Sequence, residues 1–468
     1  MPDDVFLQTA GNQFVTRGGE PVKLHGVGLG GWLNMENYIL GFPGTEALVR
    51  SALTEVLGDA LVEHFLERFT EVFFTDADAA EMKRVGFNVV RIPVHYRRLE
   101  HDSSPFELEE SGFAALDRAI ASCARQGLYT LIDLHVIPGS QNGFWHSDNA
   151  THRAGFWGHP HFEERVLNIW RALAARYRSN PWVAGYEPLQ EPGDPTGRQI
   201  VRFFPKLLDA IREVDPDHIL FLKGNEFGSE FDFYTEARQN TVFIAFDFAV
   251  PGTVVGGPYP GPSAGVHYDR SVLEQRFLQI TEQARRTDTP VWIVEFGPIY
   301  TDDDEFNENR YRVLRDQLDI YHEHGANWSL WNWKDVGVHG VVELAPDSAY
   351  LRRIAPVLAK KERLATDAWG DESEIRHVTD PLRALVRHEF PDHPNPDVWV
   401  SRLVRQILLG EPLVREYAEC FRGLTVPGID AMMSSFALEN CAPRKPLVNA
   451  IKSAIAADAA ATEALHGQ

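Results

Sequence analysis

The sequence predicts an α/β fold, a (β/α)8 TIM barrel with a C-terminal helical appendage. Eight short, nearly continuous apolar runs alternate with stretches of helical periodicity between residues 25 and 364. Strands that are buried on both faces have this composition, and eight of them joined by helices close a parallel barrel. Beyond about residue 365 the pattern is purely helical and punctuated by proline. We therefore expect a barrel domain at 25–364 and a helical appendage at 365–468.

The elements follow in order along the chain. Residues 1–24 are expected to form a hairpin that plugs the bottom of the barrel, because short alternating runs flank Gly18-Gly19. The glycine-rich run from His25 to Glu36 is taken as the first barrel strand. The remaining strands are expected at 86–93, 129–135, 182–191, 218–222, 241–248, 291–297 and 326–331. Helices are expected at 46–69, 76–85, 112–126, 162–177 and 199–214.

Two glutamates lie at the C-terminal ends of predicted barrel strands. Glu191 follows a run that begins at Trp182 and precedes Pro192, and Glu295 ends a run that begins at Val291. A single such glutamate is most simply a strand cap or an ion-pair partner. The carboxyl ends of all the strands in a parallel barrel meet at one face, however, so two glutamates placed in this way can share one site. Paired carboxylates there predict glycosidic chemistry, with the two groups about 5 to 5.5 Å apart in a retaining enzyme.

Composition limits the range of partners. There are 45 Lys and Arg residues against 67 Asp and Glu residues, which gives a net charge of −22. This charge repels nucleic acid and anionic membranes, so we expect a small-molecule substrate. Cys123, Cys420 and Cys441 are too few and too scattered for a disulfide framework or a zinc site, and no metal or cofactor is expected. The acidic N-terminus and the lack of a long apolar run predict a cytoplasmic protein that is not exported.

Several motifs occur in a specific order. They are Gly30-Gly31-Trp32-Leu33 with Glu36, Asn88 to Val94 around Arg91, Asp133-Leu134-His135 with Pro138 to Gly143, Glu191-Pro192, Glu295-Phe296-Gly297, and Trp331 with Trp333-Lys334-Asp335. In this order the sequence resembles glycoside hydrolase family 5, cellulase-like enzymes that include the fungal exo-β-glucanases, over roughly residues 20–360.

The resemblance implies that Glu191 is the acid/base, Glu295 the nucleophile and Arg91 a support for the nucleophile. It also implies that His135, Glu36 and Trp331 line the sugar subsite. Asn142 belongs to the motif that follows the third strand and is expected to bind substrate. Trp145, His146, Asp148 and Asn149 lie further along the same loop, where they are expected to contact substrate or to order the loop.

The sequence departs from the family pattern in two places. Gln190 stands where the family has an Asn that binds the 2-hydroxyl of the sugar. After the sixth strand, Phe246-Asp247-Phe248 replaces a His-x-Tyr pattern, although a shift of one residue would align Asp247 with the His. The two Phe residues keep the ring volume while removing a ring nitrogen and a hydroxyl, and Gln190 keeps the amide but moves it by one methylene. These changes predict an unusually apolar sugar subsite and poor activity on common β-glucosides.

Three functions are compatible with this pattern. The first is a retaining β-glycosidase that acts on a small glycoside or glycoconjugate. The second uses the same glutamates for glycosyl transfer or another reaction through a cationic intermediate, in specialised metabolism. The third is a sugar-binding descendant without catalysis, which we favour least because both glutamates are present.

Overall fold

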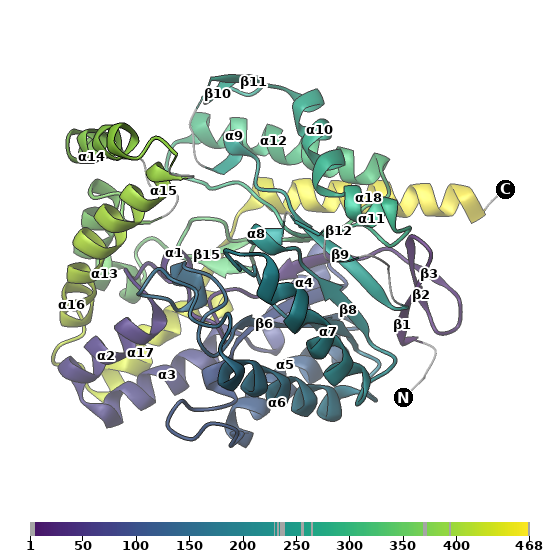
Figure 1. Cartoon of the computed structure of the whole chain (residues 1–468), viewed down its shortest axis with the longest axis horizontal. Helices are drawn as coiled ribbons and strands as arrows, with labels where there is room; N and C mark the ends of the chain where they lie inside the picture. The colour runs from purple at the N-terminus through teal and green to yellow at the C-terminus, as the bar shows by residue number, and fades with distance from the viewer. Residues whose placement is uncertain are drawn as a thin grey trace.

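The computed structural model describes residues 5–228, 230–231, 234, 239–253, 257–263, 265–367, 372–392 and 395–466. Its centre is a closed barrel of parallel strands in the order β12-β13-β4-β5-β6-β7-β8-β9, with helices around the outside (Figure 1). The strands are β4 (His25–Gly28), β5 (Val89–His95), β6 (Tyr129–Val136), β7 (Val183–Glu187), β8 (Ile219–Leu222), β9 (Thr241–Phe246), β12 (Trp292–Glu295) and β13 (Asn327–Leu330). The predicted fold is therefore confirmed.

Some of the helices that cover the barrel begin and end at residues with the expected capping chemistry. In α4 (Asp76–Val85), the side chains of Thr75 and Asp78 form a capping box, and Gly86 ends the helix with a φ of 117°. The single helix predicted for 46–69 is two helices, because Gly58 adopts a φ of 82° between them. The covering helices are α2 (Glu46–Leu57), α3 (Asp59–Phe73), α4, α5 (Glu110–Arg125), α6 (Pro160–Tyr177), α7 (Arg198–Arg212), α10 (Arg270–Ile280), α11 (Glu282–Arg286), α12 (Asp304–Glu323) and α13 (Ala349–Arg363).

Shorter elements occupy the loops. They include α1 (Asn37–Leu40), α8 (Asn225–Gly228), α9 (Val250–Thr253), the hairpin β10 (Gly261–Ser263) with β11 (Val266–Tyr268), and the strands β14 (Lys334–Asp335) and β15 (Val342–Leu344).

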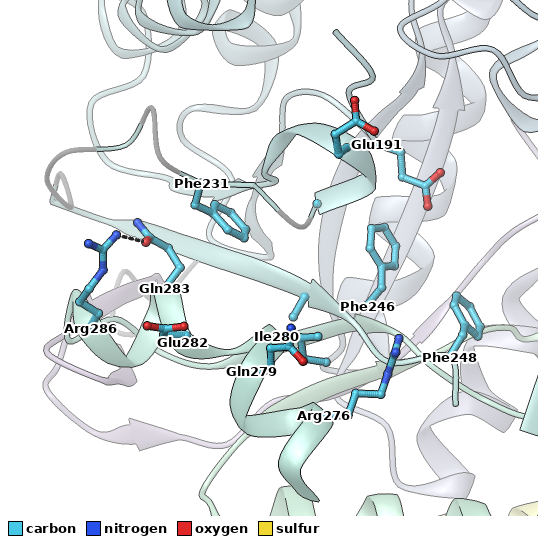
Figure 2. Close-up of a pocket in the computed structure, with 13 residues that line it drawn as sticks. Glu191, Phe231, Phe246, Phe248, Arg276, Gln279, Ile280, Glu282, Gln283 and Arg286 are labelled. Carbon is cyan, nitrogen blue, oxygen red and sulfur yellow. Dashed lines mark hydrogen bonds between the residues drawn. The ribbon is translucent and has the colours of Figure 1, made fainter. Parts of the chain in front are cut away.

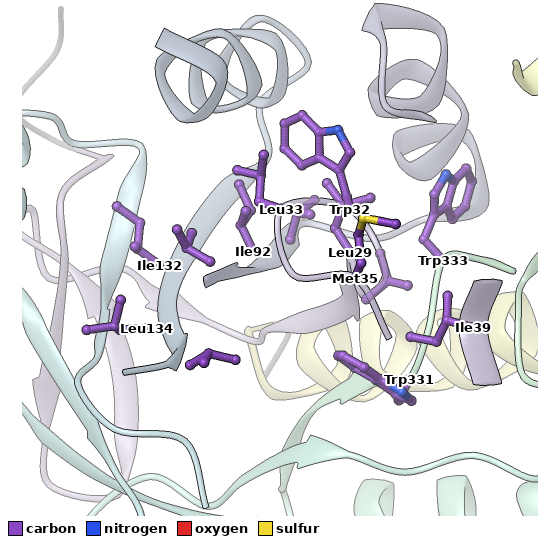
Figure 3. Packing of buried hydrophobic residues seen from close by; sticks show 14 of the residues in the cluster. Leu29, Trp32, Leu33, Met35, Ile39, Ile92, Ile132, Leu134, Trp331 and Trp333 are labelled. Carbon is purple, nitrogen blue, oxygen red and sulfur yellow. The ribbon is translucent and has the colours of Figure 1, made fainter. Parts of the chain in front are cut away.

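Glycines at the end of β4 and just after it make room for a tryptophan. A Cβ on Gly28 would lie 2.6 Å from Cε3 of Trp331, and a Cβ on Gly30 would lie 2.6 Å from its Cη2. Any larger side chain would displace this indole. Figure 3 shows the surrounding core, in which Leu29 and Trp32 follow β4 and Ile92 and Ile132 come from the adjacent strands β5 and β6.

The N-terminal residues form a three-stranded antiparallel sheet, β1 (Leu7–Ala10), β2 (Gln13–Thr16) and β3 (Pro21–Val22). Phe14 of β2 packs against two rings of the barrel. The centroid of its ring lies 6.0 Å from that of Phe221 and 6.3 Å from that of Trp292. We therefore keep the proposal that this segment plugs the end of the barrel away from the strand carboxyl ends.

The C-terminal helices pack on the barrel at two separate places. Figure 1 shows α14 (Arg376–Glu389), α15 (Pro396–Ser401) and α16 (Glu411–Glu419) on one flank, and α18 (Lys445–His466) on another. Between α15 and α16 lies the π-helix η5 (Arg402–Gly410). After α17 (Val426–Met433), the strand β16 (Cys441–Pro443) pairs with β15.

Among the described residues, no helix is long and apolar enough to cross a membrane.

Candidate active site

Arg91 on β5 is the centre of a buried ionic cluster. It donates from Nη1 to Oε1 of Glu295 at 2.5 Å and from Nε to Oε2 of Glu187 at 2.7 Å. Its Nη2 lies 2.8 Å from Oδ2 of Asp133 and donates to Oε1 of Gln190 at 2.9 Å. Burial opposes the charge, but Asp133, Glu187 and Glu295 outweigh it and hold the pKa of Arg91 well above its usual value. The guanidinium is thus a permanent cation that fixes Oε1 of Glu295.

Lys223, directly after β8, adds a second buried cation. Its Nζ lies 2.8 Å from Oε1 of Glu187, donates to Oε1 of Gln190, and sits 3.9 Å from the centre of the Phe246 ring. The carboxamide of Gln190 is therefore held by Arg91 and Lys223, and its Nε2 donates to Oε1 of Glu295 at 3.2 Å. Gln190 orients Glu295 as well as lining the cavity beside it.

Glu191 lies beyond the end of its strand. The sequence predicted that the strand would run to Glu191, but β7 ends at Glu187, because Pro188 cannot donate to the sheet. Glu191 adopts a φ of 42°, a left-handed conformation that is uncommon for residues other than glycine and is often found at active sites. The Nδ2 of Asn142 donates to the backbone oxygen of Glu191 at 2.9 Å and so supports this conformation.

His146 pairs with the side chain of Glu191. Its Nε2 lies 2.8 Å from Oε2 of Glu191, and its ring stacks on Phe144 at 5.5 Å with an interplanar angle of 8°. Burial would raise the pKa of Glu191, but the charge and hydrogen bond of His146 outweigh it and lower this pKa to about 2. For His146, burial lowers the pKa and Glu191 raises it, with a net rise.

The site also contains a parallel pair of rings and two further carboxyl groups. His135 lies parallel to Trp331, with centroids 6.2 Å apart, and its Nδ1 lies 2.6 Å from Oδ2 of Asp133. The Nε1 of Trp331 donates to the hydroxyl of Tyr38 at 2.6 Å. Burial raises the pKa of Glu36 to about 8, although His146 opposes this, so Glu36 is protonated at neutral pH. Burial and then Arg91 hold the pKa of His135 well below its usual value, so His135 is neutral.

Two adjoining cavities meet at Glu191. The smaller has a volume of about 220 Å³, and its walls include Glu36, Tyr38, His135, Trp145, His146, Gln190, Glu191, Phe248, Glu295, Trp331 and Gln406. The larger, of about 590 Å³, extends from Glu191 past Phe246, Phe248 and Arg276 to Gln283 and Arg286 (Figure 2). Glu191 and Phe248 line both.

Most of the residues expected at the site lie there, with three differences from the sequence-based expectation. Arg91 and Asn142 are not on the cavity wall and act through Glu295 and Glu191. Phe246 faces the larger cavity. Asp247 is on the wall of neither cavity and accepts hydrogen bonds from Arg276 at 3.1 Å and Tyr321 at 2.7 Å.

His146, from the loop after the third strand, lines the small cavity. Three further side chains at the site were not among the predicted residues: Lys223, Tyr38 and Gln406. Lys223 directly follows a predicted strand, which is a usable signal. Gln406 has no such signal, because it reaches the cavity from the C-terminal helical region more than 100 residues after Glu295.

A parallel barrel with two glutamates on one cavity, one ion-paired with Arg and the other with His, defines the class of protein as a barrel glycoside hydrolase. A model of the family described as Cellulase (glycosyl hydrolase family 5) matches residues 62–337, more than half of the chain. The chain belongs to this family.

Relatives and solved structures agree with this assignment. The chain is 44% identical over 463 residues to a protein named beta-xylosidase from Phanerodontia chrysosporium, covering 94% of this chain and 96% of the relative. It is 28% identical over 358 residues to a probable glucan 1,3-beta-glucosidase A from Neosartorya fischeri, covering 68% and 84%. A crystal structure of Thermotoga maritima Cel5A with mannotriose superposes with a TM-score of 0.51 at 19% identity, covering 68% of this chain and 92% of that chain.

Proposed function

We propose that this chain is a retaining β-glycosidase in which Glu295 is the nucleophile and Glu191 the general acid/base. The observation that carries the proposal is that both carboxylates line one small cavity in different electrostatic settings. Glu295 contacts a permanent cation, Arg91, which holds one carboxylate oxygen in place. Glu191 contacts His146, whose proton can be exchanged.

In the first step, Glu295 attacks the anomeric carbon while Glu191 protonates the glycosidic oxygen, and the aglycone leaves. Arg91 and Gln190 both contact Oε1 of Glu295, which leaves Oε2 to form the new bond. In the second step, Glu191 takes a proton from water, whose oxygen attacks the anomeric carbon and releases Glu295. Two inversions at this carbon give net retention.

The proton for the first step belongs to the His146–Glu191 pair. In the resting pair it resides on His146, because the ion pair holds the pKa of Glu191 low and raises that of His146. It reaches the glycosidic oxygen by way of Oε2 of Glu191. Transfer from His146 leaves two neutral groups, which suits the enclosed site better than a lone charge.

The two cavities bind different parts of the substrate. A volume of about 220 Å³ lies below the roughly 300–1,000 Å³ of pockets for drug-sized ligands, and so fits one sugar ring. The parallel His135 and Trp331 rings offer a flat wall to it. Because the acid/base must contact the leaving oxygen, the larger cavity that shares Glu191 is the place for the aglycone.

We further propose a β-xyloside as the preferred substrate. Xylose lacks the hydroxymethyl group of glucose, and Phe248 on the wall of the small cavity offers no polar partner to such a group. The 44% identity to a protein named beta-xylosidase supports the same choice.

Aryl β-xyloside and aryl β-glucoside, assayed with the wild type and with Glu295→Gln, test the proposal. We expect hydrolysis of the xyloside by the wild type and its loss in the variant. A product joined to an acceptor other than water would indicate glycosyl transfer instead. Binding of the xyloside without turnover by the wild type would contradict an enzymatic role.

A further inference from the structure

The π-helix η5 lies against the loop that carries His146. Arg402, Gln406 and Gly410 recur every fourth residue and so lie on one side of the helix. The guanidinium carbon of Arg402 is 3.9 Å from the centre of the Phe144 ring. A Cβ on Gly410 would lie 2.6 Å from Cη2 of Trp145, so only glycine allows this close approach. The helix is thereby fixed against Phe144 and Trp145, which lie beside His146.

Gln406, between these two contacts, reaches the small cavity. Its side chain lines the cavity together with Glu191 and Glu295, and the residue is 8% exposed. Among the described residues its Oε1 is buried and has no hydrogen-bond partner. Trp145 lines the same cavity at 5% exposure, and its Nε1 is likewise buried without a described partner. Two residues that line the sugar site therefore each carry one buried polar group without a described partner.

Such groups are unfavourable in the empty protein. A buried acceptor or donor that loses its bonds to water and gains none destabilises the folded state. If Gln406 only covered the cavity, Leu or Met would fill the same space without this penalty. A carboxamide offers both donors and an acceptor, and the indole offers a donor, which together match the hydroxyls of a sugar ring.

We propose that Gln406 is a substrate-binding residue that determines specificity, and that η5 completes the glycone site by supplying it. The ligand is the glycone ring of a β-glycoside, and Gln406 binds one of its hydroxyls. This inference rests on the proposed function for the identity of the ligand. It assigns to the C-terminal helical region a direct part in substrate recognition.

The test uses the full chain and a series of aryl β-xylosides that lack the 2-, 3- or 4-hydroxyl in turn. Gln406→Leu should lower kcat/KM for the parent xyloside about 3- to 10-fold, the usual worth of one neutral hydrogen bond. For the deoxy substrate that lacks the bound hydroxyl, the variant and the wild type should have equal kcat/KM. Leu408→Ala, on the same helix at 58% exposure, is the control and should leave all rates unchanged within about twofold.

An equal loss on every substrate would show that Gln406 acts only through packing, and no loss on any would show that it does not bind the sugar. Either outcome overturns the inference while leaving the catalytic assignment intact, provided that Glu295→Gln is inactive. If Gln406→Leu does not fold, Gln406→Asn keeps the amide and is compared in the same way.

If the wild type hydrolyses no glycoside, the proposed function fails. The inference is then tested by measuring the affinity of the wild type and of Gln406→Leu for D-xylose by calorimetry. Weaker binding to Gln406→Leu than to the wild type would support it. Equal binding, or no binding to the wild type, would overturn it.

Discussion

His146 Nε2 lies 2.8 Å from Oε2 of Glu191, so the proposed acid/base is paired with a cation. The pair holds one exchangeable proton, and the pKa of His146 is raised above 6.5 by Glu191 against the effect of burial. A group with a raised pKa keeps its proton to higher pH, so the acid function should persist above pH 6.5 and fall as pH rises further. We expect the alkaline limb of the kcat/KM profile for an aryl β-xyloside above pH 6.5.

His146→Ala provides the matched comparison. Without His146, burial is opposed only by the smaller effects of Lys223 and His135, so the pKa of Glu191 should rise from about 2. The alkaline limb should then follow Glu191 and change position, and substrates with poor leaving groups should lose about 10²-fold or more in kcat. An unchanged limb in His146→Ala would show that the pair does not supply the proton.

Glu295→Gln should abolish turnover while leaving the fold intact. Removing the nucleophile is expected to lower kcat by on the order of 10³-fold or more, because no covalent intermediate can form. In the wild type, NMR during hydrolysis should show the β-anomer of the free sugar first, as retention requires. Appearance of the α-anomer first would mean inversion, and thus a wider separation of the two carboxylates than we predict.

The barrel could be predicted from sequence because it depends on local periodicity. The run that ends at Glu295 is the strand β12, and Asp76–Val85 is a helix with the predicted bounds. The end of the strand before Glu191 was predicted four residues too late, because the strand was extended to the glutamate although Pro188 has already ended the ladder.

The site was less accessible to sequence reasoning where tertiary contacts decide. Phe246 and Phe248 lie two residues apart and were expected in one subsite, yet Phe246 faces only the larger cavity. β9 ends at Phe246, so the alternation of a strand does not extend to Phe248 and does not reveal which cavity each ring lines. Gln406 is the extreme case, since its helix carries no motif and its place depends on packing against Phe144 and Trp145.

Glu36 makes the stability of the protein depend on pH. Burial raises its pKa from 4.5 to about 8, so between these values the folded state binds a proton that the unfolded state has lost. The free energy of unfolding should therefore fall as pH rises from about 4.5 to about 8. Glu36→Gln should remove this slope between pH 6 and 8 in urea titrations. Equal slopes in the two proteins would show that Glu36 is ionised in the fold.

Asp458 should attach the last helix to the barrel. Its Oδ2 lies 2.6 Å from Nε2 of His25 and its Oδ1 lies 2.6 Å from Nδ1 of His322, so one carboxylate on α18 joins β4 and α12. Asp458→Ala should lower the free energy of unfolding by about 1–3 kcal/mol, because two imidazoles lose their partner. Lys452→Ala, exposed on the same helix, is the control. A change in KM without a change in stability would contradict this structural role.

Phe248 should set the preference between xylosides and glucosides. It is the ring at the sixth strand that lines the small cavity, where it presents carbon atoms to the sugar. A glucoside adds a hydroxymethyl group that would lose its water partners there, so the wild type should favour the xyloside in kcat/KM by about 10-fold or more. Phe248→Tyr adds one hydroxyl at nearly constant volume and should raise the ratio of glucosidase to xylosidase activity about 2- to 10-fold.

Phe246→His changes the neighbouring ring in the larger cavity and should leave that ratio unchanged while altering the response to the aglycone. If Phe246→His shifts the glucoside-to-xyloside ratio and Phe248→Tyr does not, the two cavities have been assigned to the wrong halves of the substrate.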